Sequence, residues 1–134
     1  MRIAARSAAL LTAAFVTIGC DQVTKHAATV LLEGKPDRSY VADTLRLGYS
    51  ENTGGFLSLG ADLPPAARTA VFTVATGCLL LALLAIGVRQ GYAGWSALGL
   101  VLFVAGGFSN WIDRALHGRV VDFLNVGIGS VRTG

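Results

Sequence analysis

The stretch TAVFTVATGCLLLALLAIGV, residues 69–88, decides the fold, because it has no charged residue and is bracketed by Arg68 and Arg89. An α-helix rises 1.5 Å per residue, so a run of this length spans about 30 Å, the thickness of a bilayer's hydrocarbon core. The stretch therefore predicts a membrane-spanning helix at about residues 67–89.

Two further spans lie on either side of this helix. Residues 90–112 are uncharged and rich in glycine, which lets helix backbones approach closely in lipid, and they predict a helix at about 91–113. The uncharged run from Ser7 to Cys20 is too short to span alone. A helix at about 8–32 is long enough if Asp21 and Lys25 face other helices or the far interface, and their spacing of four lets them pair.

The composition agrees with a membrane protein. The 134 residues are 53% hydrophobic and 14% charged, whereas a soluble domain has about a quarter charged residues. A net charge of +3, scattered along the chain, argues against nucleic acid as a partner. Cys20 and Cys78 lie inside apolar runs and are interpreted as small core residues. We therefore predict an all-α membrane protein with three transmembrane helices in a single integral membrane domain, residues 1–134.

A polar segment at about 33–65 separates the first two helices. It contains the β-like pieces Tyr40-Val41, Leu45–Tyr49 and Phe56–Leu59 between turn residues, and Pro64-Pro65 closes it. The sequence predicts a small β-like platform here, at the membrane surface. Residues 114–134 form a second outer segment.

The basic residues predict the orientation. Arg2, Arg6 and Arg89 fall on one side of the membrane, which the positive-inside rule makes cytoplasmic. The platform then faces outward, on the extracytoplasmic side of a bacterial inner membrane. Arg114, Arg119 and Arg132 depart from the rule on the outer side, so we expect them to have local partners.

Four polar clusters converge near the outer face in this topology. They are Asp21-Gln22-Val23-Thr24-Lys25, Asn52-Thr53-Gly54-Gly55-Phe56, Asn110-Trp111-Ile112-Asp113-Arg114 and Gly118-Arg119-Val120-Val121-Asp122-Phe123. Neighbouring carboxylates hold and activate a water when burial and mutual repulsion separate their pKa values, leaving one acid and one base. The histidines His26 and His117 lack metal-ligand spacing, so neither a metal nor a cofactor is predicted.

Structural explanations compete for three of these clusters. Asp21 and Lys25 could be an ion pair that ends a helix, residues 52–55 could be a plain turn, and Asp113-Arg114 could be a helix-end pair. Asp122 is different, because a carboxylate flanked by Val121 and Phe123 at the lipid boundary has few structural explanations, so function is favoured there.

In this order, the motifs D-x-x-T-K, N-T-G-x-F, N-x-x-D-R and G-x-V-V-D-F resemble signal peptidase II, the lipoprotein signal peptidase. Each motif alone is weak, but four in order across nearly the whole chain are specific. The resemblance implies an aspartic endopeptidase of the inner membrane. Its partners would be membrane lipid and a prolipoprotein substrate, cut before a diacylglyceryl-modified cysteine. At Gly55-Phe56-Leu57 the chain departs slightly from the family pattern.

The resemblance also implies residue roles. It assigns Asp122 to the catalytic aspartate pair and gives supporting or substrate-binding roles to Asp21, Lys25, Asn52, Gly54, Asn110, Asp113 and Arg114. The residues alone would have paired Asp122 with Asp113. The family's second catalytic aspartate lies in an F-N-x-A-D motif that opens a fourth helix, beyond Gly134. We therefore expect an incomplete copy of the enzyme that lacks activity by itself.

Two alternatives remain from the sequence. Residues 1–20 resemble a lipoprotein signal peptide ending at Gly19-Cys20, which would make the chain a lipoprotein with a lipidated Cys20. Thr17 stands where this motif usually has leucine, and a mature lipoprotein would not need two more spans. A non-catalytic membrane scaffold is the other alternative, but it leaves the retained polar clusters unexplained.

Overall fold

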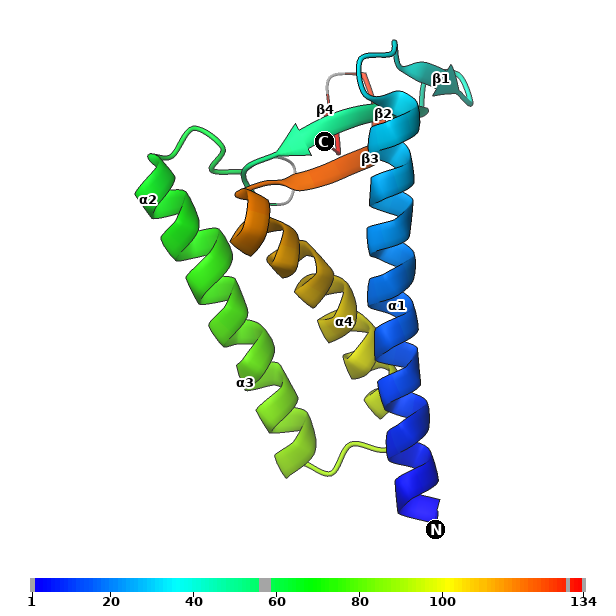
Figure 1. Ribbon diagram of the computed structural model, residues 1–134, viewed down its shortest axis with the longest axis vertical. Helices are drawn as coiled ribbons and strands as arrows, with labels where there is room; N and C mark the ends of the chain where they lie inside the picture. The colour runs from blue at the N-terminus through cyan, green and yellow to red at the C-terminus, as the bar shows by residue number, and fades with distance from the viewer. Residues whose placement is uncertain (1, 56–58, 130, 134) are drawn as a thin grey trace.

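The computed structural model describes residues 2–55, 59–129 and 131–133, and these form three helical rods joined by a small sheet at one end (Figure 1). The helical elements are α1 (Arg2–Leu32), α2 (Pro65–Arg68), the π-helical η2 (Thr69–Ala75), α3 (Thr76–Arg89) and α4 (Gly94–His117). The strands are β1 (Arg38–Tyr40), β2 (Leu45–Asn52), β3 (Val120–Ile128) and β4 (Val131–Arg132).

Each rod is long and apolar enough to cross a membrane. The three candidate spans among the described residues are Ala5–Leu32, Pro65–Arg89 and Gly94–His117. Large apolar side chains on them point outward, as for Phe15 with 72% and Leu81 with 67% of its surface exposed. Such exposure is stable in lipid but not in water. The predicted fold class, a helical membrane protein with three spans and a small platform, is confirmed.

The helix boundaries differ from the predicted ones. The first helix begins at Arg2 instead of about residue 8, because residues 2–7 include strong helix formers. The second begins at Pro65, since proline suits the first helical position. The third runs from Gly94 to His117 rather than 91–113. Gly91 has a φ of 62°, which turns the chain before α4, and Gly118 ends the helix with a φ of 71°.

The sequence predicted a platform built from residues 33–65 alone, but the observed sheet also includes residues that follow the third helix. The sheet has the order β1-β2-β3-β4 within the described residues, so half of its strands follow the third helix. β2 and β3 pair antiparallel from Leu45 opposite Val126 to Asn52 opposite Val120, with an irregularity between Leu47 and Ser50. Because β2 and β3 are far apart in the sequence, their pairing cannot be recognised from the residue pattern of either strand. Of the expected piece Phe56–Leu59, residues 56–58 lie outside the described residues and Leu59 is in a turn.

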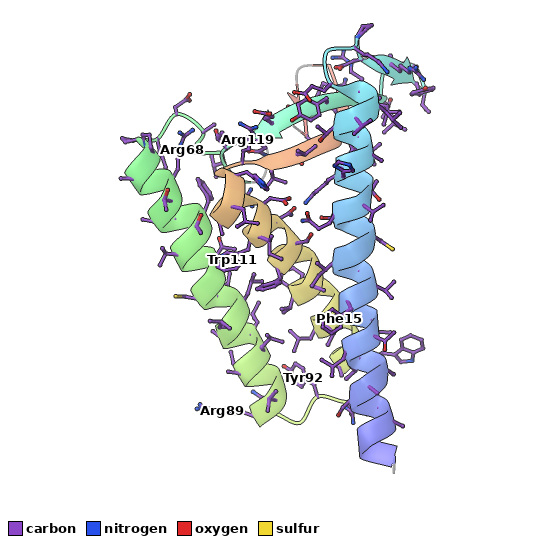
Figure 2. The ribbon with its side chains drawn as sticks, in the orientation of Figure 1. Phe15, Arg68, Arg89, Tyr92, Trp111 and Arg119 are labelled. Atoms are coloured by element: carbon purple, nitrogen blue, oxygen red, sulfur yellow. The ribbon has the colours of Figure 1, made fainter. Side chains whose placement is uncertain are left out.

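The rods place the chain's polar parts at opposite ends. The N-terminal end of α1 and the α3–α4 connection lie together at one end, where the Arg6 guanidinium donates to the carbonyl oxygen of Tyr92 (Figures 1 and 2). The sheet caps the other end, near Arg68 and Arg119. The four polar clusters therefore share one end of the molecule, whichever side of a membrane that end faces.

α3 and α4 pack through Trp111 and Gly77. The Trp111 indole lies between the two helices and donates to the carbonyl oxygen of Thr73 at 2.8 Å (Figure 2). Thr73 belongs to η2, and the wider π-helical turn is a distortion that occurs often at functional sites. The indole fits because Gly77 has no side chain: a Cβ there would lie 2.8 Å from Trp111 Nε1.

Gly77→Ala should therefore destabilise the fold although alanine is the better helix former. The added methyl forces the indole away from Thr73, and overpacking of this kind costs about 1–3 kcal/mol. Thermal unfolding in detergent micelles measures the loss. Gly99→Ala is the matched control, because a Cβ at Gly99 meets nothing within 4 Å. Equal midpoints for the two variants would contradict this packing.

Candidate functional site

A buried ammonium joins α1 to α4 at the sheet end of the bundle. Lys25 has 7% of its surface exposed, and its Nζ lies 2.6 Å from Asp21 Oδ2, 2.7 Å from Asp113 Oδ2 and 2.7 Å from Asn110 Oδ1. An ammonium has three hydrogens, so these three acceptors satisfy it completely. The predicted Asp21–Lys25 pair is thus present, and it faces another helix instead of ending one.

Gln22 and Ser109 close this network into a ring. Gln22 Nε2 donates to Asp113 Oδ1 and to Ser109 Oγ, each at 2.9 Å. Ser109, with no exposed surface, donates in turn to Asp21 Oδ2 at 2.7 Å. Two carboxylates and one ammonium leave a formal charge of −1, which these neutral donors help to stabilise in a buried place.

The segment Asn52–Gly55 is a turn held by its own asparagine. The Asn52 side chain accepts from the Gly54 N–H at 2.9 Å and donates to the Gly55 carbonyl at 3.0 Å. Arg114 of α4 donates to the Gly54 carbonyl at 2.7 Å, and its guanidinium lies 6.0 Å from the centre of the Phe72 ring. Asn52, Gly54 and Arg114 are thereby brought together, with the turn fixed to α4.

Asp122 lies on β3 and lines a cleft of about 550 Å³ beneath the sheet. The cleft is bounded by η2, α3, α4 and the β2–β3 ribbon, and Asn52, Asn110 and Arg114 share its lining. Val120 and Leu124 line it with Asp122, as expected for alternate residues on one face of a strand. Among the described residues of this lining, Asp122 is the one carboxylate.

Asp113 and Asp122 line different pockets. Asp113 is buried against Lys25 and Gln22 on the α1 side of α4, while Asp122 follows Gly118 into the sheet. The pairing of these two aspartates that the residues alone suggested is therefore unsupported. Asp37, in contrast, lines a small pocket with Asp122 and fills the space above Gly48, a proximity that the polar sequence around it did not reveal.

A second pocket of about 270 Å³ opens between α1, α4 and the sheet. Its lining includes His26, Tyr49, His117 and Arg119. Burial, together with a 2.8 Å hydrogen bond to Glu51, raises the pKa of the Tyr49 phenol. Glu51 also pairs with Arg119 at 3.2 Å.

The arginines that depart from the positive-inside pattern have local partners, as expected. Besides Arg114 and Arg119, Arg132 donates to Asn125 Oδ1 at 2.6 Å and lies 3.5 Å from Asp43. Hydrogen bonds from Arg46 and Ser39 hold the pKa of Asp43 well below its usual range. Asp43 thus links the β1–β2 turn to β4.

Sequence reasoning missed Gln22 and Ser109 as members of the ring, and Tyr49 and Glu51 in the second pocket. A signal for Ser109 was available, because it stands four residues before Asp113 and so shares its helix face. For Tyr49 and Glu51 no signal connected them with this pocket, because Arg119, the ion-pair partner of Glu51, lies far along the chain in the turn between α4 and β3.

Comparisons with known proteins agree with this architecture. The model of a family described as signal peptidase (SPase) II matches residues 13–133. The lipoprotein signal peptidase of Chlorobium phaeobacteroides (strain DSM 266) is 31% identical over 115 residues, covering 86% of this chain and 66% of that protein. The lipoprotein signal peptidase of Mycobacterium tuberculosis (strain H37Rv) is 34% identical over 133 residues, covering 88% of this chain and 58% of that protein.

A solved structure shares the fold. A bacterial membrane enzyme determined by the in meso method at 2.3 Å resolution superposes with a TM-score of 0.75 at 24% identity, covering 90% of this chain and 71% of its own. The chain spans less than two thirds of the length of both curated relatives named above.

Lys25→Met should destabilise the chain strongly. It leaves the buried Asp113 and the half-buried Asp21 without their ammonium, and removal of one partner from a buried ion pair costs about 3–5 kcal/mol. The double variant Lys25→Met/Asp113→Leu should regain most of this loss, because the buried Lys25–Asp113 pair is replaced by apolar side chains and the half-buried Asp21 keeps its hydrogen bond from Ser109.

Unfolding midpoints in detergent micelles measure both effects. Lys35→Met is the control: it makes the same change at an exposed position and should shift stability by no more than about 0.5 kcal/mol. If the single and double variants lose the same stability, Lys25 is not the centre of the interface.

Proposed function

Because the chain belongs to the signal peptidase II family, we propose that it serves as a membrane aspartic endopeptidase that removes signal peptides from prolipoproteins. The substrate would be cut before its diacylglyceryl-modified cysteine. The observation that carries the proposal is the cleft containing Asp122, since it joins a carboxylate to hydrogen-bonding side chains at one end of the membrane helices.

Asp122 is the catalytic carboxylate of this proposal. In aspartic peptidases one carboxylate takes a proton from the attacking water while the other protonates the substrate. Asp122 has the freedom for such a role, because within the described residues it forms no salt bridge, unlike Asp21 and Asp113. The partner carboxylate is the one that the family places in its F-N-x-A-D motif.

The remaining site residues have supporting roles in this proposal. Asp21, Lys25 and Asp113 fix α1 against α4, and Asn52, Gly54 and Arg114 shape the turn at the cleft. The lipoprotein alternative is less well supported, because processing at Cys20 would remove more than half of α1. An N-terminus at a lipidated Cys20, found by mass spectrometry of the intact chain, would favour that alternative.

Asp122→Asn should abolish prolipoprotein cleavage, because an amide cannot act as a general base at neutral pH. The assay uses a chain joined to the family's fourth helix and a diacylglyceryl-modified prolipoprotein, followed by gel mobility. Asp62→Asn makes the same change at an exposed position and should retain cleavage. Asp113→Asn should lower cleavage through reduced stability, without removing the catalytic group. Normal turnover by Asp122→Asn would end the assignment.

For orientation we propose a cytoplasmic N-terminus and an extracytoplasmic sheet in the bacterial inner membrane. The support is that Arg6 and Arg89 lie at the end opposite the sheet. Single cysteines at the exposed positions Lys35 and Gln90, in a Cys20→Ser/Cys78→Ser background, test this. A membrane-impermeant maleimide should label Lys35→Cys in intact spheroplasts and Gln90→Cys only after lysis. The reverse pattern would invert the topology.

A further inference from the structure

Asn110 stands between the buried ring and the cleft. Its Oδ1 accepts from Lys25 Nζ at 2.7 Å, while the residue itself lines the cleft that contains Asp122. A carboxamide has an accepting oxygen on one branch and a donating NH₂ on the other. Because an ammonium only donates, chemistry alone requires that the oxygen branch face Lys25.

Lys25 has no freedom to release this oxygen. Each of its three hydrogens has an acceptor, and the side chain is buried between two helices. The NH₂ branch of Asn110 is therefore left for the cleft. Within the described residues, no hydrogen bond from Asn110 Nδ2 to a protein acceptor is present.

Asn52, the other amide of the cleft, provides the contrast. Both branches of its side chain are committed to the turn, the oxygen to the Gly54 N–H and the NH₂ to the Gly55 carbonyl. Two amides thus line one cleft. The Asn52 NH₂ has one hydrogen committed to Gly55, whereas among the described residues neither hydrogen of the Asn110 NH₂ has a protein acceptor.

We propose that Lys25 is a positioning residue that locks the Asn110 amide, so that Nδ2 donates a hydrogen bond to the carbonyl oxygen of the peptide bond held beside Asp122. The proposal rests on the proposed function and adds the group that recognises and polarises the carbonyl. A fixed donor is more effective than a mobile one, because it needs no reorganisation when the ligand arrives.

The test compares two uncleavable peptides that carry a diacylglyceryl-modified cysteine. In one, a ketomethylene group replaces the peptide bond and keeps its carbonyl. In the other, that carbonyl is reduced to a methylene. The ratio of their dissociation constants isolates the carbonyl's hydrogen bond, because a merely structural defect weakens both peptides alike. For the unchanged chain in micelles we expect the methylene peptide to bind about tenfold more weakly.

Three variants test whether this ratio depends on the Asn110 N–H and on its positioning by Lys25. Asn110→Asp keeps an oxygen for Lys25 but has no N–H, so its ratio should fall below about twofold. Lys25→Met/Asp113→Leu removes the lock without leaving the buried Asp113 carboxylate unpaired, and its ratio should fall below about threefold. Gln22→Met is the matched control: it disturbs the same helix interface without touching Asn110, and it should retain the tenfold ratio at lower thermal stability.

A tenfold ratio in Asn110→Asp would contradict the assignment of Asn110 as the hydrogen-bond donor. A tenfold ratio in the double variant would contradict the positioning role of Lys25. Circular dichroism verifies that each variant is folded. If the unchanged chain binds neither peptide, the proposed function fails instead. The amide orientation is then decided on the free chain by NMR: Overhauser contacts from the Asn110 amide protons to cleft side chains support the orientation, and contacts to Asp21 overturn it.

Discussion

The three hydrogen bonds of the Lys25 ammonium are the constraint on which the rest of the structure depends. Two of them, to Asn110 and Asp113, connect α1 to α4 across more than eighty residues of sequence, in a bundle whose apolar surfaces mostly face outward. Lipid tails are as apolar as leucine, so burial of apolar surface contributes little to holding membrane helices together. The specific association of the helices therefore depends on polar groups that would otherwise face hydrocarbon, since one charge in hydrocarbon costs about 2.5–3.5 kcal/mol on insertion scales.

α4 connects this network to the rest of the site. One side of the helix carries Asp113 and Ser109 toward α1, another carries Trp111 toward η2, and Arg114 reaches the turn at Gly54. Its end at Gly118 then directs the chain into β3, which pairs with β2. Asp122 is thus positioned by two separate attachments, the helix end at Gly118 and its own pairing with Ser50 of β2.

The arrangement also separates two kinds of carboxylate. Asp21 and Asp113 both pair with Lys25 and accept hydrogen bonds from neutral donors, which suits a structural role in a helix interface. Asp122 lies in the cleft with amide and guanidinium neighbours. The same residue type therefore has different chemistry available on opposite sides of one helix, because its neighbours differ.

The sequence by itself determined the three spans, since a charge-free run of about twenty residues has few other stable locations. Spacing alone also predicted the pairing of Asp21 with Lys25, four residues apart on one helix. Only the tertiary structure decided that β3 completes the sheet, that Asp113 faces Lys25 and not Asp122, and that Ser109 and Gln22 close the ring. These features depend on helix rotation and strand register, which are fixed by contacts between segments and leave no local pattern in either segment.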